Sequence, residues 1–103
     1  MRVISRRALR EFWEVHPASK DALAVWFRLT ECSDFPDFSA TKRAFRSVDY
    51  VAPYTVFDLG GNKYRVITVI HYNRRRVYIR HVLTHADYDR WSDGIRSRKR
   101  GRR

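Results

Sequence analysis

Three runs of β-forming residues, joined by two turn-like segments, constrain the fold more than any other feature of this sequence. The first run, Tyr54 to Leu59, precedes Gly60-Gly61-Asn62, whose residue types accept positive φ and suit a tight hairpin turn. The second run, Tyr64 to Tyr72, precedes a basic turn at residues 73–76, and the third run is Val77 to Thr84. We therefore expect an antiparallel meander with the second run at its centre.

The central run is apolar on both faces, as in a strand that is covered on both sides or that lines a groove. Strict alternation puts Tyr64, Val66, Thr68, Ile70 and Tyr72 on one face and Arg65, Ile67, Val69 and His71 on the other. Arg65 therefore stands out as a charge on an apolar face. The same alternation predicts Arg80 and Val82 on one face of the third run, with Ile79 and His81 opposite.

The N-terminal half reads as a short strand followed by two helices. Residues 1–4 suit an edge strand, and apolar residues recur at helical spacing from Arg6 to His16 until Pro17 ends the ladder. Ser19 begins a second helix whose apolar stripe has the spacing of a helix that packs on a sheet. That stripe consists of Leu23, Trp26, Phe27 and Thr30.

The remaining segments carry weaker signals. Cys32 to Pro53 reads as loop, with one or two helical turns in Ala40 to Phe45, and His85 to Trp91 reads as a short terminal helix or turn. The fold class is therefore α+β: two N-terminal helices packed on a small antiparallel β-sheet, with a short C-terminal helix. We expect one domain over 1–95 and a disordered basic tail over 96–103.

The net charge of +11 on 103 residues favours a polyanionic partner. Nucleic acid is the leading candidate, because no segment has the amphipathic pattern of a membrane-binding helix. Six of the 22 Lys and Arg residues lie in the tail, so the rest of the chain is basic in its own right. The single cysteine, Cys32, and the lack of a signal-peptide pattern favour a reducing cytoplasm.

Several kinds of chemistry find no support in the pattern. The acids do not cluster as metal ligands, and the four histidines lack the paired spacing of a metal site. There is no G-x-S-x-G nucleophile motif, and Gly60-Gly61 lacks the other residues of a phosphate-binding loop. We therefore expect neither a metal nor a cofactor.

Metal-free cleavage of RNA requires only three kinds of group. These are a base that takes the proton of the ribose 2′-OH, cations that stabilise the charged phosphate, and an acid that protonates the leaving oxygen. His85 can serve as base or acid, since its reference pKa lies near neutrality. Arg65 and Arg80 can clamp the phosphate, Lys63 can add a point charge, and Tyr88 can stack on a base or transfer a proton. Each residue also has a purely structural alternative, such as an Arg65 ion pair or a capping His85.

Further basic residues are candidates for holding RNA without reading its sequence. In the turn these are Arg74, Arg75 and Arg76, and in the tail they are Arg98, Lys99 and Arg100. The alternative for the three turn residues is that they only form a solvated turn.

Two motifs resemble those of the HigB family of type II toxins, within the RelE/ParE-like superfamily. They are FDLGGNKYRVITVI and YIRHVLTHADYD, and RVISRRALREFWEVHP and KRAFRSVDYV are similar to the same family, so the likeness spans about residues 1–91. Lys63 and Arg65 occupy the N-K-Y-R motif, His85 and Tyr88 occupy the T-H-x-x-Y motif, and Arg80 matches a commonly basic position. Asp58 departs from the family, which usually has Asn there, and the basic tail is also unusual.

The resemblance implies an mRNA interferase that cuts mRNA, often on the translating ribosome, and that a HigA-like helix-turn-helix antitoxin neutralises. Its implied fold is a small antiparallel sheet around a basic groove, with two N-terminal helices on the other side. Two alternatives stay open: a non-catalytic basic protein that binds RNA or the ribosome, and an inhibitor of topoisomerase like the ParE relatives.

Overall fold

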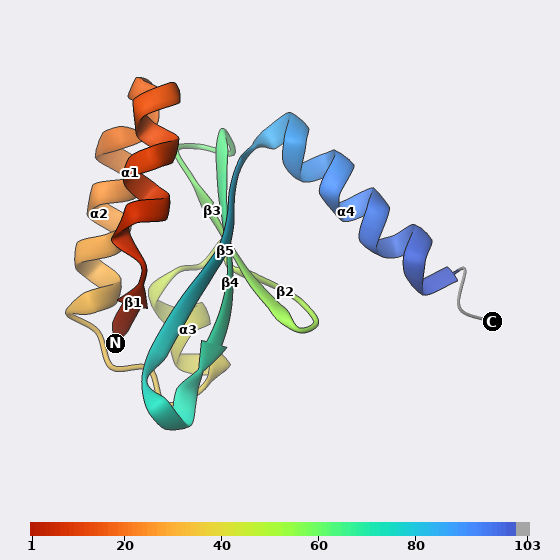
Figure 1. Ribbon diagram of the computed structural model, residues 1–103. Helices are drawn as coiled ribbons and strands as arrows, with labels where there is room; N and C mark the ends of the chain where they lie inside the picture. Colours follow the sequence, from red (N-terminus) through yellow and green to blue (C-terminus); the bar gives the residue numbers. More distant parts are fainter. Residues whose placement is uncertain (101–103) are drawn as a thin grey trace.

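The computed structural model describes the backbone of residues 1–100 and the side chains of residues 1–95. Within these residues, five strands, four α-helices and two short 3₁₀ turns form an α+β fold (Figure 1). In chain order they are β1 (Arg2–Ile4), α1 (Arg6–Val15), a 3₁₀ turn (Pro17–Ser19), α2 (Lys20–Glu31), α3 (Phe38–Ala44), β2 (Asp49–Val51), β3 (Tyr54–Leu59), β4 (Tyr64–His71), a 3₁₀ turn (Tyr72–Arg74), β5 (Arg76–Thr84) and α4 (His85–Arg100).

The strands form a single sheet in the order β1-β5-β4-β3-β2. The predicted meander of β3, β4 and β5 is confirmed, and β2 adds a further antiparallel strand that the sequence did not reveal. The prediction of a wholly antiparallel sheet is wrong, because β1 pairs parallel with β5, with Val3 opposite Val77. A strand of three residues has too little pattern to signal its direction, and only the return of the chain through α1 and α2 decides it.

Helices α1 and α2 lie side by side against one face of the sheet (Figure 1). Leu9 from α1 and Leu23 and Trp26 from α2 are buried there, and the Trp26 ring meets Phe57 of β3 edge-on at 5.2 Å. The predicted stripe of α2 therefore forms the core, as helical periodicity requires. We call the opposite side of the sheet the open face; it carries Asp58 and Arg65, which are cross-strand neighbours.

A β-bulge in β5 changes the predicted alternation. Val66 pairs with Val82 and Ile67 with His81, but Thr68 pairs with Ile79, so Arg80 is an extra residue. Ile79 and Val82 consequently share the core face, and the prediction that separated them is wrong. A bulge inserts one residue and reverses the parity of every side chain beyond it, which simple alternation cannot anticipate.

The turn between β3 and β4 forms as predicted. Gly60, Gly61 and Asn62 all have positive φ, at 63°, 62° and 74°. At Gly60 a Cβ atom would lie only 3.0 Å from the Tyr64 ring, so both the backbone and the space favour glycine.

Helix α4 begins where the sequence predicted, with the Asp87 amide donating to Thr84 Oγ1 at 3.3 Å. It is longer than predicted, since the backbone is helical through Arg100, where a disordered tail was expected from residue 96. Arg and Lys are good helix formers, so the absence of apolar residues removes packing partners without preventing a helix. Residues 101–103 lie outside the described part. Figure 1 shows α4 pointing away from the sheet.

The loop region from 32 to 53 contains more structure than predicted. Asp37 caps α3 by accepting the Ala40 amide at 2.9 Å. No helix within the described residues has the length and apolar character that a membrane span requires.

Candidate active site

Arg65 is the centre of the candidate site. It lies on the open face of β4 and is 8% exposed, so its charge requires partners. Nη1 donates to Asp58 Oδ1 at 2.9 Å and to the carbonyl oxygens of Asn62 and Tyr64 at 3.1 and 3.3 Å. The ion pair joins β3 to β4 and holds the guanidinium in one orientation.

The second terminal nitrogen of Arg65 faces His85 at the start of α4. Nη2 lies 3.2 Å from His85 Nδ1. A guanidinium can only donate, so Nδ1 accepts, and the neutral imidazole carries its proton on Nε2. Nε2 lies 3.4 Å from Asp89 Oδ2, one turn along the helix. Arg65, His85 and Asp89 thus form a chain of polar contacts from buried to exposed.

The backbone fixes His85 against the turn between β3 and β4. The His85 amide donates to the Lys63 carbonyl oxygen at 2.9 Å, which places the first turn of α4 beside that turn. Lys63 itself is exposed. Its place in the site therefore comes from the backbone, and its side chain is accessible to a ligand.

Tyr88 covers the face of the guanidinium, with Arg65 Cζ 5.1 Å from the ring centroid. Such a cation–π contact stabilises the charge without using a hydrogen-bond donor. Tyr88 follows His85 by three residues, so both side chains lie on one side of α4. The structure thus brings together Arg65, His85 and Tyr88, the three residues on which the sequence prediction of a nuclease mainly rests.

An aromatic cluster holds this part of α4 on the sheet. The Trp91 ring stacks on Tyr88 at 5.9 Å, meets Tyr54 of β3 edge-on at 5.1 Å and lies 6.1 Å from His81 of β5. We call Tyr54, His81, Tyr88 and Trp91 the α4 anchor. Its contacts determine where His85 and Tyr88 stand relative to Arg65.

The other predicted residues lie elsewhere or remain undescribed. The Arg80 guanidinium lies over the Tyr78 ring at 5.9 Å and makes no described contact with Arg65 or His85. In the turn, Arg74, Arg75 and Arg76 are all exposed, and Arg75 pairs with Asp34. The side chains of the predicted RNA-binding residues Arg98, Lys99 and Arg100 lie outside the described ones.

Sequence reasoning missed three contributors. It noted Asp58 only as an unusual acid, although Asp58 is the partly buried partner of Arg65. Asp89 was also passed over, yet its i+4 spacing from His85 on a predicted helix was a usable signal. No sequence pattern indicates the contact between Trp91 and Tyr54, because residues 37 positions apart meet only in the folded chain.

Asp58 offsets the charge of Arg65, and Lys63 and Asp89 add one further cation and one further anion to the site. Among the described residues, no three His, Cys, Asp or Glu side chains converge as metal ligands.

Tyr72, at the other end of β4, has a raised pKa, mainly because burial disfavours its charged form. Its hydroxyl lies 3.1 Å from Thr41 Oγ1.

Comparison with known proteins identifies similar chains. A family model, the HigB toxin, described as the RelE-like toxic component of a toxin-antitoxin system, matches residues 19–91. The mRNA interferase toxin HigB of Escherichia coli strain K12 is 32% identical over 92 residues, covering 86% of this chain and 88% of that protein. The mRNA interferase HigB of Escherichia coli O6:H1 is 30% identical over 102 residues, covering 96% and 99% respectively.

Proposed function

The chain belongs to the HigB family, RelE-like toxic components of toxin-antitoxin systems, and from this premise we propose that it is an endoribonuclease that cleaves mRNA. Two relatives of nearly equal length are named mRNA interferases, which supports the activity. The observation that carries the proposal is the buried Arg65, held between Asp58 and His85 with Tyr88 across its face.

The chemistry follows from the contacts of Arg65. Nη2 carries two N–H donors, and only one of them faces His85 Nδ1, so a phosphate can accept a charge-assisted hydrogen bond from the other. In the proposed complex the guanidinium turns toward the bound phosphate, which frees the Nδ1 lone pair beside it. His85 then accepts the proton of the ribose 2′-OH, and Asp89 stabilises the imidazolium through Nε2.

The bond changes are those of an internal transfer. The 2′-oxygen attacks the adjacent phosphorus, the bond from phosphorus to the 5′-oxygen breaks, and the products are a 2′,3′-cyclic phosphate and a 5′-hydroxyl. Arg65 and Lys63 stabilise the charge that builds on the phosphate oxygens. The leaving 5′-oxygen needs a proton, and we assign Tyr88 as its donor. None of these steps requires a metal ion.

Membership of a toxin-antitoxin family supports a proposal for the partners and the setting. We propose a HigA-like helix-turn-helix antitoxin as the neutralising partner, the translating ribosome as the place of cleavage, and the cytoplasm as the compartment. The net charge of +11 supports a site on or near ribosomal RNA, because it accelerates encounter with polyanions.

The test compares induced wild type with His85→Ala in a bacterial host. Growth arrest with new internal mRNA ends in wild type, both lost in His85→Ala, is the expected result. Purified protein should also cleave RNA in EDTA and leave 2′,3′-cyclic phosphate ends, and loss of cleavage in EDTA would refute metal independence.

The comparison also separates the alternatives. Arrest without new mRNA ends would contradict the nuclease and favour RNA binding or topoisomerase inhibition. A folded His85→Ala protein that cleaves at the wild-type rate would refute the role of His85, with folding checked by its urea midpoint.

A further inference from the structure

Arg80 is an exposed cation that the proposed reaction does not use. Among the described residues, no carboxylate lies within ion-pair distance of it, and its guanidinium lies over the Tyr78 ring at 5.9 Å. The other side of this small cluster is His71, whose ring meets Tyr78 edge-on at 5.2 Å. We call His71, Tyr78 and Arg80 the Tyr78 cluster.

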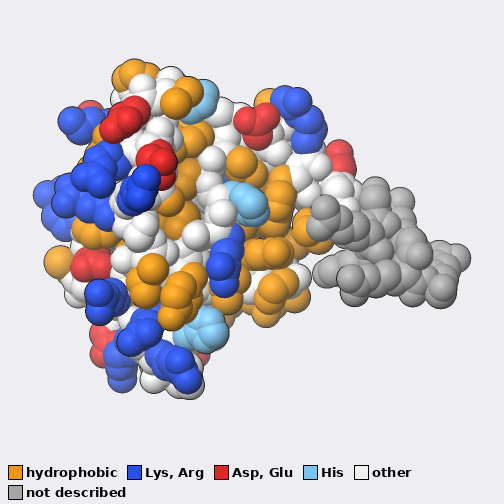
Figure 2. All heavy atoms as spheres, in the orientation of Figure 1, with side chains coloured by type: hydrophobic (Ala, Val, Ile, Leu, Met, Phe, Trp, Pro, Cys, Tyr) orange, Lys and Arg blue, Asp and Glu red, His pale blue; other side chains and the backbone are white. Residues whose placement is uncertain are grey.

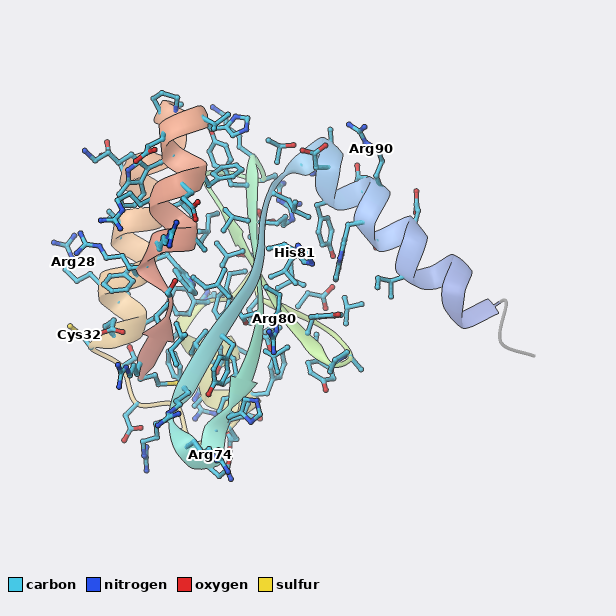
Figure 3. The ribbon with its side chains drawn as sticks, viewed as in Figure 1. Arg28, Cys32, Arg74, Arg80, His81 and Arg90 are labelled. Carbon is cyan, nitrogen blue, oxygen red and sulfur yellow. The ribbon has the colours of Figure 1, made fainter. Side chains whose placement is uncertain are left out.

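The cluster lies on β4 and β5, well away from His85. Tyr78 pairs with Val69 on the open face, and six residues of β5 separate it from His85, roughly 20 Å of extended chain. In Figure 3, Arg80 lies midway along β5, with His81 on the α4 side and Arg74 at the hairpin end. Helix α4 points away from this half of the sheet (Figure 1), and Arg80 also borders a surface hollow lined by Phe12 and Val15 of α1.

The bulge explains how a cation comes to lie here. Arg80 is the extra residue in β5, so it adds an exposed guanidinium while Ile79 and Val82 keep their places on the core face. Bulges often re-aim a side chain next to a functional site. The Arg80 side chain is exposed and is not part of the hydrophobic core.

An aromatic ring beside an exposed cation suits single-stranded nucleic acid. A base stacks on the ring, Arg adds a cation–π contact, and nearby cations follow the phosphates. Arg74 and Arg76 are exposed at the same end of the hairpin, and Figure 2 shows Lys and Arg side chains gathered there. The ligand chemistry is therefore an unpaired nucleotide with its phosphate.

We propose that Tyr78, Arg80 and His71 form a second nucleotide-binding subsite, remote from His85, that holds a single-stranded stretch of RNA flanking the cleaved phosphate. The choice of RNA as ligand rests on the proposed ribonuclease function. An RNA that spans both sites gains affinity from each, whereas a short RNA occupies only one.

The test uses fully 2′-O-methylated RNA, which lacks the attacking hydroxyl and cannot be cleaved by the proposed route. Fluorescence anisotropy compares labelled oligonucleotides of about 4 and about 12 nucleotides. Wild type should bind the longer RNA more tightly. Tyr78→Leu should reduce this ratio of affinities by about 5- to 100-fold, and Tyr78→Phe, which keeps the ring, should restore most of it.

Arg80→Ala gives an independent signature, because it removes a charge and leaves the ring. It should lower the slope of log K against log salt by about 0.7, whereas Tyr78→Leu should leave that slope unchanged. Arg28→Ala and Tyr50→Leu are matched controls, since both remove exposed side chains of the same type on other elements. Urea midpoints confirm that each variant is folded.

The outcomes separate the subsite from the catalytic proposal. If the protein cleaves RNA but Tyr78→Leu does not change the ratio of affinities for the longer and shorter RNA, the subsite is refuted and the nuclease is not. If the wild-type protein does not cleave RNA, and Tyr78→Leu removes its tighter binding of the longer RNA, the result supports the subsite and refutes the nuclease. Equal losses in the control variants, or loss of antitoxin binding with RNA affinity unchanged, would also overturn the subsite.

Discussion

Removing Arg65 and Asp58 singly and together tests whether Arg65 acts in catalysis or only holds the sheet together. Their side chains are 10% and 18% exposed and the atoms lie 2.9 Å apart, so the gross attraction is about 6 kcal/mol at an effective dielectric constant of about 20. Desolvation cancels much of this gain. Loss of one partner leaves a buried, unpaired charge and should cost about 3–5 kcal/mol.

The double variant Arg65→Met with Asp58→Ala should be more stable than the sum of the single losses implies, by about 2 kcal/mol. Urea unfolding followed by tryptophan fluorescence measures this. With a slope of about 1–3 kcal/mol per molar urea, each single variant should lower the midpoint by roughly 1–5 M. Strictly additive losses would refute the description of Arg65 and Asp58 as a buried pair.

The folded double variant then isolates the chemistry. It should cleave RNA at least about 100-fold more slowly than wild type, because it lacks the donors that stabilise the charged phosphate. Asp58→Asn, which keeps the guanidinium and an acceptor at position 58, is the matched control and should retain more activity. Wild-type cleavage by the double variant would show that Arg65 only joins β3 to β4.

Three further predictions follow from single contacts. Asp89→Asn should slow single-turnover cleavage by no more than about fivefold, since the His85–Asp89 pair is exposed; a much larger loss would give Asp89 a direct role. Trp91→Leu should lower stability by about 1–3 kcal/mol and speed hydrogen exchange in the first turns of α4, with Trp91→Phe nearer to wild type; unchanged exchange would refute the α4 anchor. Because the Tyr72 pKa is raised, folding favours its neutral form, so its contribution to stability is complete below pH 10.0 and is lost as the pH rises through the folded pKa. Tyr72→Phe should reduce the decrease of the urea midpoint at alkaline pH. If the pH profile of the midpoint is unchanged in this variant, the assigned contribution of Tyr72 is refuted.

Local pattern predicted the strands well, because hairpins are encoded by neighbouring residues. Tyr54–Leu59 was expected with the bounds that the structure has, and β4 and β5 differ from prediction by one residue each. The turn between β3 and β4 followed from residue types that accept positive φ. The helical periods of α1 and α2 likewise predicted which residues reach the core.

The site was predicted as a list of residues, and its geometry was not. Arg65, His85 and Tyr88 were named from their chemistry and motifs, but the structure supplied Asp58 as the partner of Arg65 and the orientation of His85. Arg80 was grouped with them on chemistry alone. The bulge instead associates it with Tyr78, and an insertion of this kind has no local signature in β5.

The sequence by itself determined the α+β class, the three-stranded meander, the basic character and the motifs of the toxin family. These depend on periodicity, turn chemistry and charge, which act between residues near in the chain. Only the tertiary structure decided the parallel edge strand, the bulge, the direction of α4 and the burial of Arg65 between Asp58 and His85. Each of these depends on contacts between distant segments, whose free energies are comparable for many pairings until the whole core is packed.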